Sequence, residues 1–340
     1  NALKWTLCFP NDASIGHDNE SCSFHSFPRR CVVSAPTQIR SAEEFLSNPC
    51  WNCCKARLAC IQPLNSTAET LMRDFHLPGR SAVYASNGMC ATSHPLAAKV
   101  AVQMLESGGN AVDAAIAAAV LLGICEPQMT GIGGDCFVLL KPGGEDRVIA
   151  LNGSGRAPAA RSAKSLRDDG HKTVPVYDQH AVTVPGAIDA FCRLSRDWGK
   201  MGLKASLAPA IHYAETGVPV APRTAFDWKN SEPTLQGDAR NFYLFNGKPP
   251  RAGQVFQAPK QAEVLRRISM EGRRGFYEGE VAQDMVDSLN AMGGVHTLED
   301  FANTACDYGD PVSGTYKGID LVEHQPNGQG ATAILMNNIL

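Results

Sequence analysis

Residues 88–134 constrain the fold of this chain more than any other segment, because two helical patterns follow each other there between glycine-rich breaks. Pro95 suits the first position of a helix, and apolar residues then recur at helical spacing over 96–107. Asn110 is a good N-cap for a second helix over 111–122, whose residues are almost wholly small or apolar. Such a helix is buried on most of its faces, and it is too short to span a bilayer.

The helical segment leads into a predicted β-hairpin. The pair Glu126-Pro127 ends the second helix, and a Gly-Ile-Gly-Gly sequence precedes the apolar run 136–140, which favours a buried strand. A second strand over 147–151 follows a loop that contains two glycines. The unit is therefore a pair of helices that feeds a sheet.

The remaining elements are predicted from caps, breaks and periodicity. We expect helices over 184–198, 203–216, 261–271 and 279–292, a short helix after the capping-box pattern at 297–300, and a helix from 331 onward. Strands are expected around 89–92 and over 318–322, with a turn at 326–330. Residues 221–259 are polar and rich in aromatic residues and proline, which favours a long irregular or partly helical segment.

Composition excludes several classes of partner. The chain has 340 residues, of which 44% are hydrophobic, enough for a sizeable core. A net charge of -3 with scattered Lys and Arg gives no reason to expect binding to nucleic acid or to a membrane, and no apolar run reaches the length of a spanning helix. No signal peptide is visible, which favours the cytoplasm, although the first residue is Asn and a signal farther upstream stays open.

The chain is predicted to divide into residues 1–72 and 73–340. Seven of the 12 cysteines fall in the first part, where apolar periodicity is poor, and the spacing of Cys50 and Cys53 suits a zinc knuckle. No second well-spaced pair completes such a site, so a disordered or non-native extension is favoured over a zinc or disulfide module. The other five cysteines lie singly in apolar surroundings and are predicted to be reduced: Cys90, Cys125, Cys136, Cys192 and Cys306.

The loop that follows the second predicted strand is the candidate ligand contact. Its sequence, Asn-Gly-Ser-Gly-Arg, lets the backbone approach a ligand closely, and Arg156 offers a planar fork that suits a carboxylate. The alternative for Arg156 is a surface ion pair with a nearby acid. No P-loop, dinucleotide, nucleophile-elbow or zinc-protease motif has the required spacing, and the isolated histidines have no ligand-like spacing. We therefore predict neither a metal site nor a cofactor.

Several stretches resemble the gamma-glutamyltranspeptidase family. They are SGGNAVDAA with the later GIGG, then NGSGRAPAA, TVPGAIDAF, GFYEGEVAQDMV and HQPNGQGATA, and the resemblance covers nearly everything from about residue 75 to 340. It implies an α+β fold of the N-terminal-nucleophile hydrolase class, an αββα sandwich of which this chain would be the incomplete, large-subunit part. In this family one precursor cleaves itself into a large and a small subunit.

The resemblance also implies the chemistry. The nucleophile is the N-terminal threonine of the small subunit, whose own amine serves as its base while backbone N–H groups hold the oxyanion. The substrates are gamma-glutamyl compounds such as glutathione, or in side branches poly-gamma-glutamate and cephalosporin acyl groups. The acyl group passes to water, an amino acid or a peptide. The partner expected for this chain is the small subunit of the same precursor.

Two departures from the family pattern matter. The matching region stops before the place of the catalytic threonine, so we expect no catalytic residue within these 340 residues and no activity of the isolated fragment. The family's carboxylate-binding arginine sits three residues before an Ala-Pro pair, where this chain has Ser154, and Arg156 lies two residues later. Either Arg156 does the same work from a rearranged loop, or the chain belongs to a branch with a weaker demand for that carboxylate.

The alternative function, from another class of protein, is a non-catalytic scaffold that binds a partner.

Overall fold

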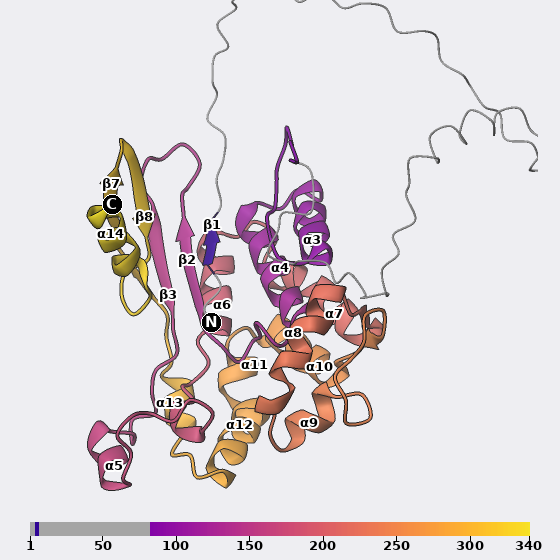
Figure 1. The fold of residues 1–340 in the computed structure, drawn as a ribbon. Helices are drawn as coiled ribbons and strands as arrows, with labels where there is room; N and C mark the ends of the chain where they lie inside the picture. Colours follow the sequence, from indigo (N-terminus) through magenta and orange to yellow (C-terminus); the bar gives the residue numbers. More distant parts are fainter. Residues whose placement is uncertain (1–3, 7–81) are drawn as a thin grey trace, which may run out of the picture. The chain divides into compact units, whose positions relative to one another are not determined.

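The computed structural model describes residues 4–6 and 82–340 (Figure 1). The predictions of disorder, of a zinc site or of a disulfide module in residues 1–72 therefore lie outside the described residues, apart from the short strand β1 (Lys4–Thr6). None of the described helices is long and apolar enough to cross a membrane.

The described part of the chain combines a layer of helices with short sheets. The helices are α3 (Pro95–Glu106), α4 (Ala111–Cys125), α5 (Ala163–Asp168), α6 (Ala187–Trp198), α7 (Leu203–Thr216), α8 (Pro222–Ser231), α9 (Asp238–Tyr243), α10 (Pro259–Glu271), α11 (Arg274–Tyr277), α12 (Gly279–Ala291), α13 (Leu298–Ala302) and α14 (Gly330–Ile339), with 3-10 turns η1 (Gln179–Ala181) and η2 (Glu232–Thr234). The strands besides β1 are β2 (Cys136–Leu140), β3 (Ile149–Gly153), β4 (Val218–Pro219), β5 (Val255–Phe256), β6 (Asp307–Gly309), β7 (Val312–Tyr316) and β8 (Ile319–Glu323).

The two predicted opening helices are confirmed as α3 and α4. His94 caps α3, because its Nδ1 accepts the Leu96 N–H at 3.2 Å, and burial lowers the pKa of this imidazole. Asn110 and Asp113 form a capping box at the start of α4. The Asp113 carboxylate also accepts the Lys200 N–H at 3.0 Å, which ties the start of α4 to the loop after α6.

The predicted hairpin is confirmed, and its second strand lies two residues later than expected. β2 and β3 pair antiparallel with Cys136 opposite Gly153, in a sheet of order β1-β2-β3-β6. The strand expected around residues 89–92 is wrong, because the residues there have no strand partner. Strand β6 was not predicted, since three residues that end in glycine carry no alternation.

A second hairpin, β7-β8, was predicted only in its second half. Its turn is Lys317-Gly318, both with positive φ, which is the geometry of a tight two-residue hairpin turn. Residues 221–259 are partly helical, as expected, and contain α8, η2 and α9 before the short strand β5.

The core lies mainly among the helices, and a few residues of β2 and β3 join it. α6 contacts both β2 and β3, while α4 packs against α3, α6 and α7, and α7 in turn packs against α10 (Figure 1). The five described cysteines are free, as predicted. Burial raises the pKa of Cys125, Cys136 and Cys192 to about 12, so these thiols are protonated packing groups.

Candidate functional site

The loop that carries Ser154 and Arg156 is pressed against the start of α6. A Cβ added at Gly155 would collide with the Val184 carbonyl oxygen, and one added at Gly186 would collide with the Gly153 carbonyl oxygen. The Val184 N–H also donates to the Arg156 carbonyl oxygen at 2.9 Å. The two glycines therefore permit a close approach of two backbone segments, which any other residue type would allow only if the backbone moved. This approach fixes the position of the loop after β3.

Ser154 belongs to a small polar network that joins distant parts of the chain. Its hydroxyl accepts the Asn327 side-chain amide N–H at 2.6 Å, and Asn327 Oδ1 accepts the Asn152 amide at 3.1 Å. Asn152 Oδ1 in turn accepts the Ser154 backbone N–H at 2.9 Å. The turn before α14 thus helps to fix the Ser154 hydroxyl.

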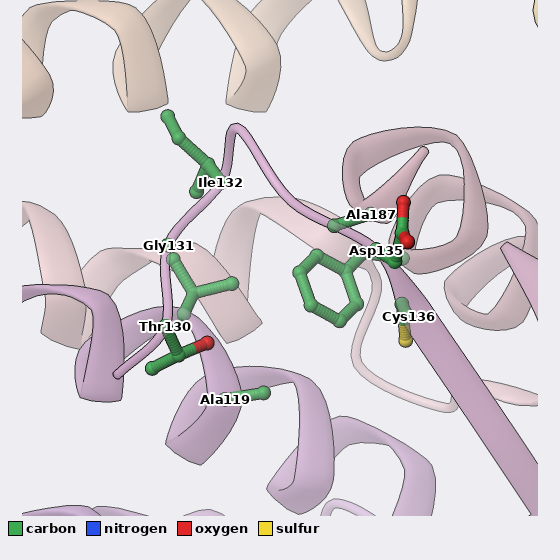
Figure 2. A pocket seen from close by; sticks show the side chains of 9 residues that line it. Ala119, Thr130, Gly131, Ile132, Asp135, Cys136 and Ala187 are labelled. Carbon is green, nitrogen blue, oxygen red and sulfur yellow. The ribbon is translucent and has the colours of Figure 1, made fainter. Parts of the chain in front are cut away.

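The glycine-rich loop before β2 also contacts the candidate loop and the start of α6. Asp135 Oδ1 accepts the Gly155 N–H at 2.8 Å, and the Gly134 carbonyl oxygen accepts the N–H groups of Gly186 and Ala187 at 3.1 and 3.0 Å. Figure 2 shows Asp135 and Ala187 at one end of a cavity whose other wall is the backbone at Gly131. Its volume of about 20 Å³ has room for about one water molecule.

Arg156 forms an ion pair on the surface of the loop. Its Nη2 lies 2.9 Å from Asp307 Oδ2 on β6, and the two side chains are 69% and 65% exposed. A pair this exposed contributes little to stability. A guanidinium has five N–H donors, so those of Arg156 that do not contact Asp307 can bind a ligand carboxylate.

A buried network holds the elements behind this loop. Asp189 of α6 accepts Arg273 Nε at 2.8 Å and the Cys306 N–H at 2.7 Å, which fixes the residue before Asp307. The Tyr277 hydroxyl donates to the Pro185 carbonyl oxygen at 2.7 Å, directly before Gly186. Burial raises the pKa of this phenol above its usual range, so it remains a donor. The network therefore positions the segment before Asp307 and the segment before Gly186, both of which contact the candidate loop.

The predicted site residues Ser154 and Arg156 lie on one loop, and different partners hold them. Sequence reasoning missed Asn327, Asp307 and Asp135. Asn327 lies in the predicted Pro-Asn-Gly turn and Asp135 directly follows the Gly-Ile-Gly-Gly sequence, whereas no signal marked Asp307. His296 and His324 are buried: His296 Nε2 lies 3.0 Å from the Val182 carbonyl oxygen, and His324 Nε2 lies 3.1 Å from that of Leu151. Within residues 82–340 no group of three His, Cys, Asp or Glu side chains is placed to hold a metal ion.

We expect Gly155→Ala to displace this loop and to lower the free energy of unfolding by about 1–3 kcal/mol, the usual cost of overpacking. Gly143→Ala is the matched control, because a Cβ there meets no atom within 4 Å. Urea unfolding of the two variants measures the difference. Equal stability of both variants would contradict the close packing of Gly155 against Val184.

Comparisons with known proteins agree on one family. The family model described as Gamma-glutamyltranspeptidase matches residues 97–340. The "Glutathione hydrolase-like YwrD proenzyme" of Bacillus subtilis (strain 168) is 34% identical over 267 residues, which are 76% of this chain and 49% of that protein. The chain thus spans about half the length of this curated relative.

Solved structures give the same result for the fold. Cephalosporin acylase from Bacillus halodurans is 40% identical with a TM-score of 0.72, covering 79% of this chain and 52% of its own. Helicobacter pylori gamma-glutamyltranspeptidase is 27% identical with a TM-score of 0.69, covering 74% of each chain. These neighbours confirm the predicted α+β, N-terminal-nucleophile hydrolase fold.

Proposed function

Because this chain belongs to the gamma-glutamyltranspeptidase family, we propose that it is the large-subunit part of an enzyme that cleaves gamma-glutamyl amides such as glutathione. Residues 73–340 form this part in the proposal, and residues 1–72 are an extension outside the family pattern. The gamma-glutamyl group passes first to a threonine hydroxyl and then to water, an amino acid or a peptide. In this account the threonine belongs to the small subunit of the same precursor, and the chain itself supplies no catalytic residue.

The chemistry assigned to the two subunits is complementary. The threonine hydroxyl oxygen attacks the gamma-carbonyl carbon, its proton passes through the free α-amine to the leaving amine, and an ester forms. Water or an acceptor amine then attacks the ester and releases the threonine. The contribution of this chain is to orient the donor, which places the reacting carbonyl correctly and removes an entropic barrier.

The observation that carries the substrate assignment is the position of Arg156. Its side chain is 69% exposed, on a loop that accepts hydrogen bonds from Val184 and Asn327 and donates one to Asp135. We propose that Arg156 binds the α-carboxylate of the donor and that the Ser154 hydroxyl contacts the same substrate. The placement of both side chains on one supported loop is consistent with a rearranged loop, in which Arg156 does the work of the family's carboxylate-binding arginine.

Exposed apolar side chains support a partner subunit. Leu335, Met336 and Ile339 of α14 are 59%, 60% and 77% exposed, and Ile319 of the adjoining β8 is 74% exposed. Exposed large apolar side chains on two neighbouring elements are typical of an interaction surface. The name of the Bacillus subtilis relative identifies that protein as a proenzyme, which is consistent with a subunit made from the same precursor. A non-catalytic scaffold that binds another partner through this surface is the second candidate.

Expression of the full open reading frame, beside residues 1–340 alone, tests the proposed function. We expect the full protein to cleave itself and to release glutamate from glutathione, while the 340-residue chain remains at the background rate. Replacement of the new N-terminal threonine by alanine is the control and should abolish both events. An uncleaved full protein that releases no glutamate would favour the scaffold.

A further inference from the structure

The three hydrogen bonds among Asn152, Ser154 and Asn327 have fixed directions. The Ser154 backbone N–H can only donate, so the Asn152 side-chain atom that it reaches at 2.9 Å is the amide oxygen. The amide nitrogen of Asn152 therefore faces Asn327, whose oxygen accepts its N–H at 3.1 Å. The amide nitrogen of Asn327 then donates to the Ser154 hydroxyl oxygen at 2.6 Å. One backbone N–H thus sets the orientation of both side-chain amides.

The direction of the last bond determines what the Ser154 hydroxyl can do for a ligand. A serine hydroxyl has one proton and two lone pairs, and Asn327 occupies one of the lone pairs. The proton has no acceptor within residues 4–6 and 82–340, which the structure describes. The hydrogen bond from Asn327 lies at the exposed surface, so a ligand can reach the hydroxyl. Ser154 is therefore an accessible donor that lacks an acceptor.

The register of β3 and β6 brings this network next to the ion pair of Arg156. Asn152 and Asp307 lie opposite each other in the antiparallel pair, and side chains of opposite residues share one face of the sheet. Asn152 accepts the Ser154 backbone N–H, and Asp307 accepts Arg156 Nη2 at 2.9 Å. The network and the ion pair therefore meet at one position of the sheet.

A carboxylate suits the donors that gather there. Its two oxygens accept several hydrogen bonds, so the free N–H groups of Arg156 and the Ser154 hydroxyl can bind it together. Without the bond from Asn327 the hydroxyl could rotate freely, and a ligand would have to order it on binding. Holding the hydroxyl in advance removes this cost.

We propose that Asn327 is a positioning residue for the carboxylate of the gamma-glutamyl donor. It holds the Ser154 hydroxyl as an acceptor, so that the hydroxyl proton is directed to the carboxylate that Arg156 binds. The inference rests on the proposed function, because it takes the gamma-glutamyl donor as the ligand. It adds a residue that acts through Ser154 and does not itself contact the substrate.

A double-mutant cycle in the full protein tests this role. Ser154→Ala should raise KM for gamma-glutamyl p-nitroanilide about tenfold, the lower end of the loss for a hydrogen bond to a charged group. Asn327→Ala should raise it about 2- to 10-fold, because it weakens the same bond without removing it. The variant with both substitutions should have the KM of Ser154→Ala, since Asn327 acts only through the hydroxyl.

The analogue that lacks the α-carboxylate separates positioning from damage to the loop. Its KM should be the same in Asn327→Ala as in the unsubstituted protein, and so should kcat for both donors, whereas a displaced loop would raise both KM values. Asn241→Ala on α9 is the matched control. It should change neither KM, because the exposed Asn241 side chain donates to Asp238 outside the site.

The outcomes distinguish this inference from the proposed function. An unchanged KM in Asn327→Ala, or effects that multiply in the double variant, would overturn the role of Asn327 and leave the proposed function intact. A full protein that does not cleave gamma-glutamyl p-nitroanilide would contradict the proposed function, and this inference with it.

Discussion

Asp189→Ala is expected to lower the free energy of unfolding by about 3 kcal/mol, because it leaves a partly buried arginine without its counter-charge. The figure is the lower end of the usual range for such a break, since Arg273 retains 31% exposure and donates to the Ala302 and Thr304 carbonyl oxygens. The variant also orphans the Cys306 N–H. Urea denaturation of the purified chain measures the loss.

Asp168→Ala is the matched control for this prediction. Asp168 pairs with Lys164 one helical turn away, and both side chains are mostly exposed, so its removal should cost no more than about 0.5 kcal/mol. If the Asp189 variant loses no more stability than the Asp168 variant, the buried pair does not hold α6 to α11 and to the segment before β6.

Local signals predicted most of the longer helices, whereas the short helices α5 and α11 were not predicted. The capping pairs at Asn110 and Thr297 lie within one turn of the helices they start, and both are confirmed as capping boxes. The helix predicted over residues 203–216 is confirmed with both of its ends. Gly217 directly follows it and has a positive φ, a conformation that favours glycine. Each of these signals depends only on neighbouring residues.

Contacts between distant residues were not predictable in the same way. Asn327 contacts Ser154 across 173 residues, and Asp307 meets Arg156 across 151. No periodicity or cap links such positions, so the sequence indicated the loop but not its supports. Strand β6 was missed for the same reason. It is a strand because it pairs with β3, and its three residues carry no strand pattern of their own.

The fit of glycines against backbone was likewise visible only in the structure. A sequence shows that Gly155 and Gly186 permit close approach, and it does not show which backbone approaches them. In the fold they meet Val184 and Gly153, which ties the candidate loop to the start of α6. The family resemblance placed these glycines in one domain. The close backbone contacts that they make in the fold give a physical reason for glycine at both positions.

The central claim is that Arg156 binds the α-carboxylate of a gamma-glutamyl donor. The measurement that tests it most directly is the KM of Arg156→Ala, in the full protein, for gamma-glutamyl p-nitroanilide and for the analogue that lacks the α-carboxylate. A hydrogen bond to a charged group contributes about 1.5–3 kcal/mol, so we expect KM for the gamma-glutamyl donor to rise about 10- to 100-fold. KM for the analogue should not change, whereas an unchanged KM for the gamma-glutamyl donor would remove Arg156 from the substrate site.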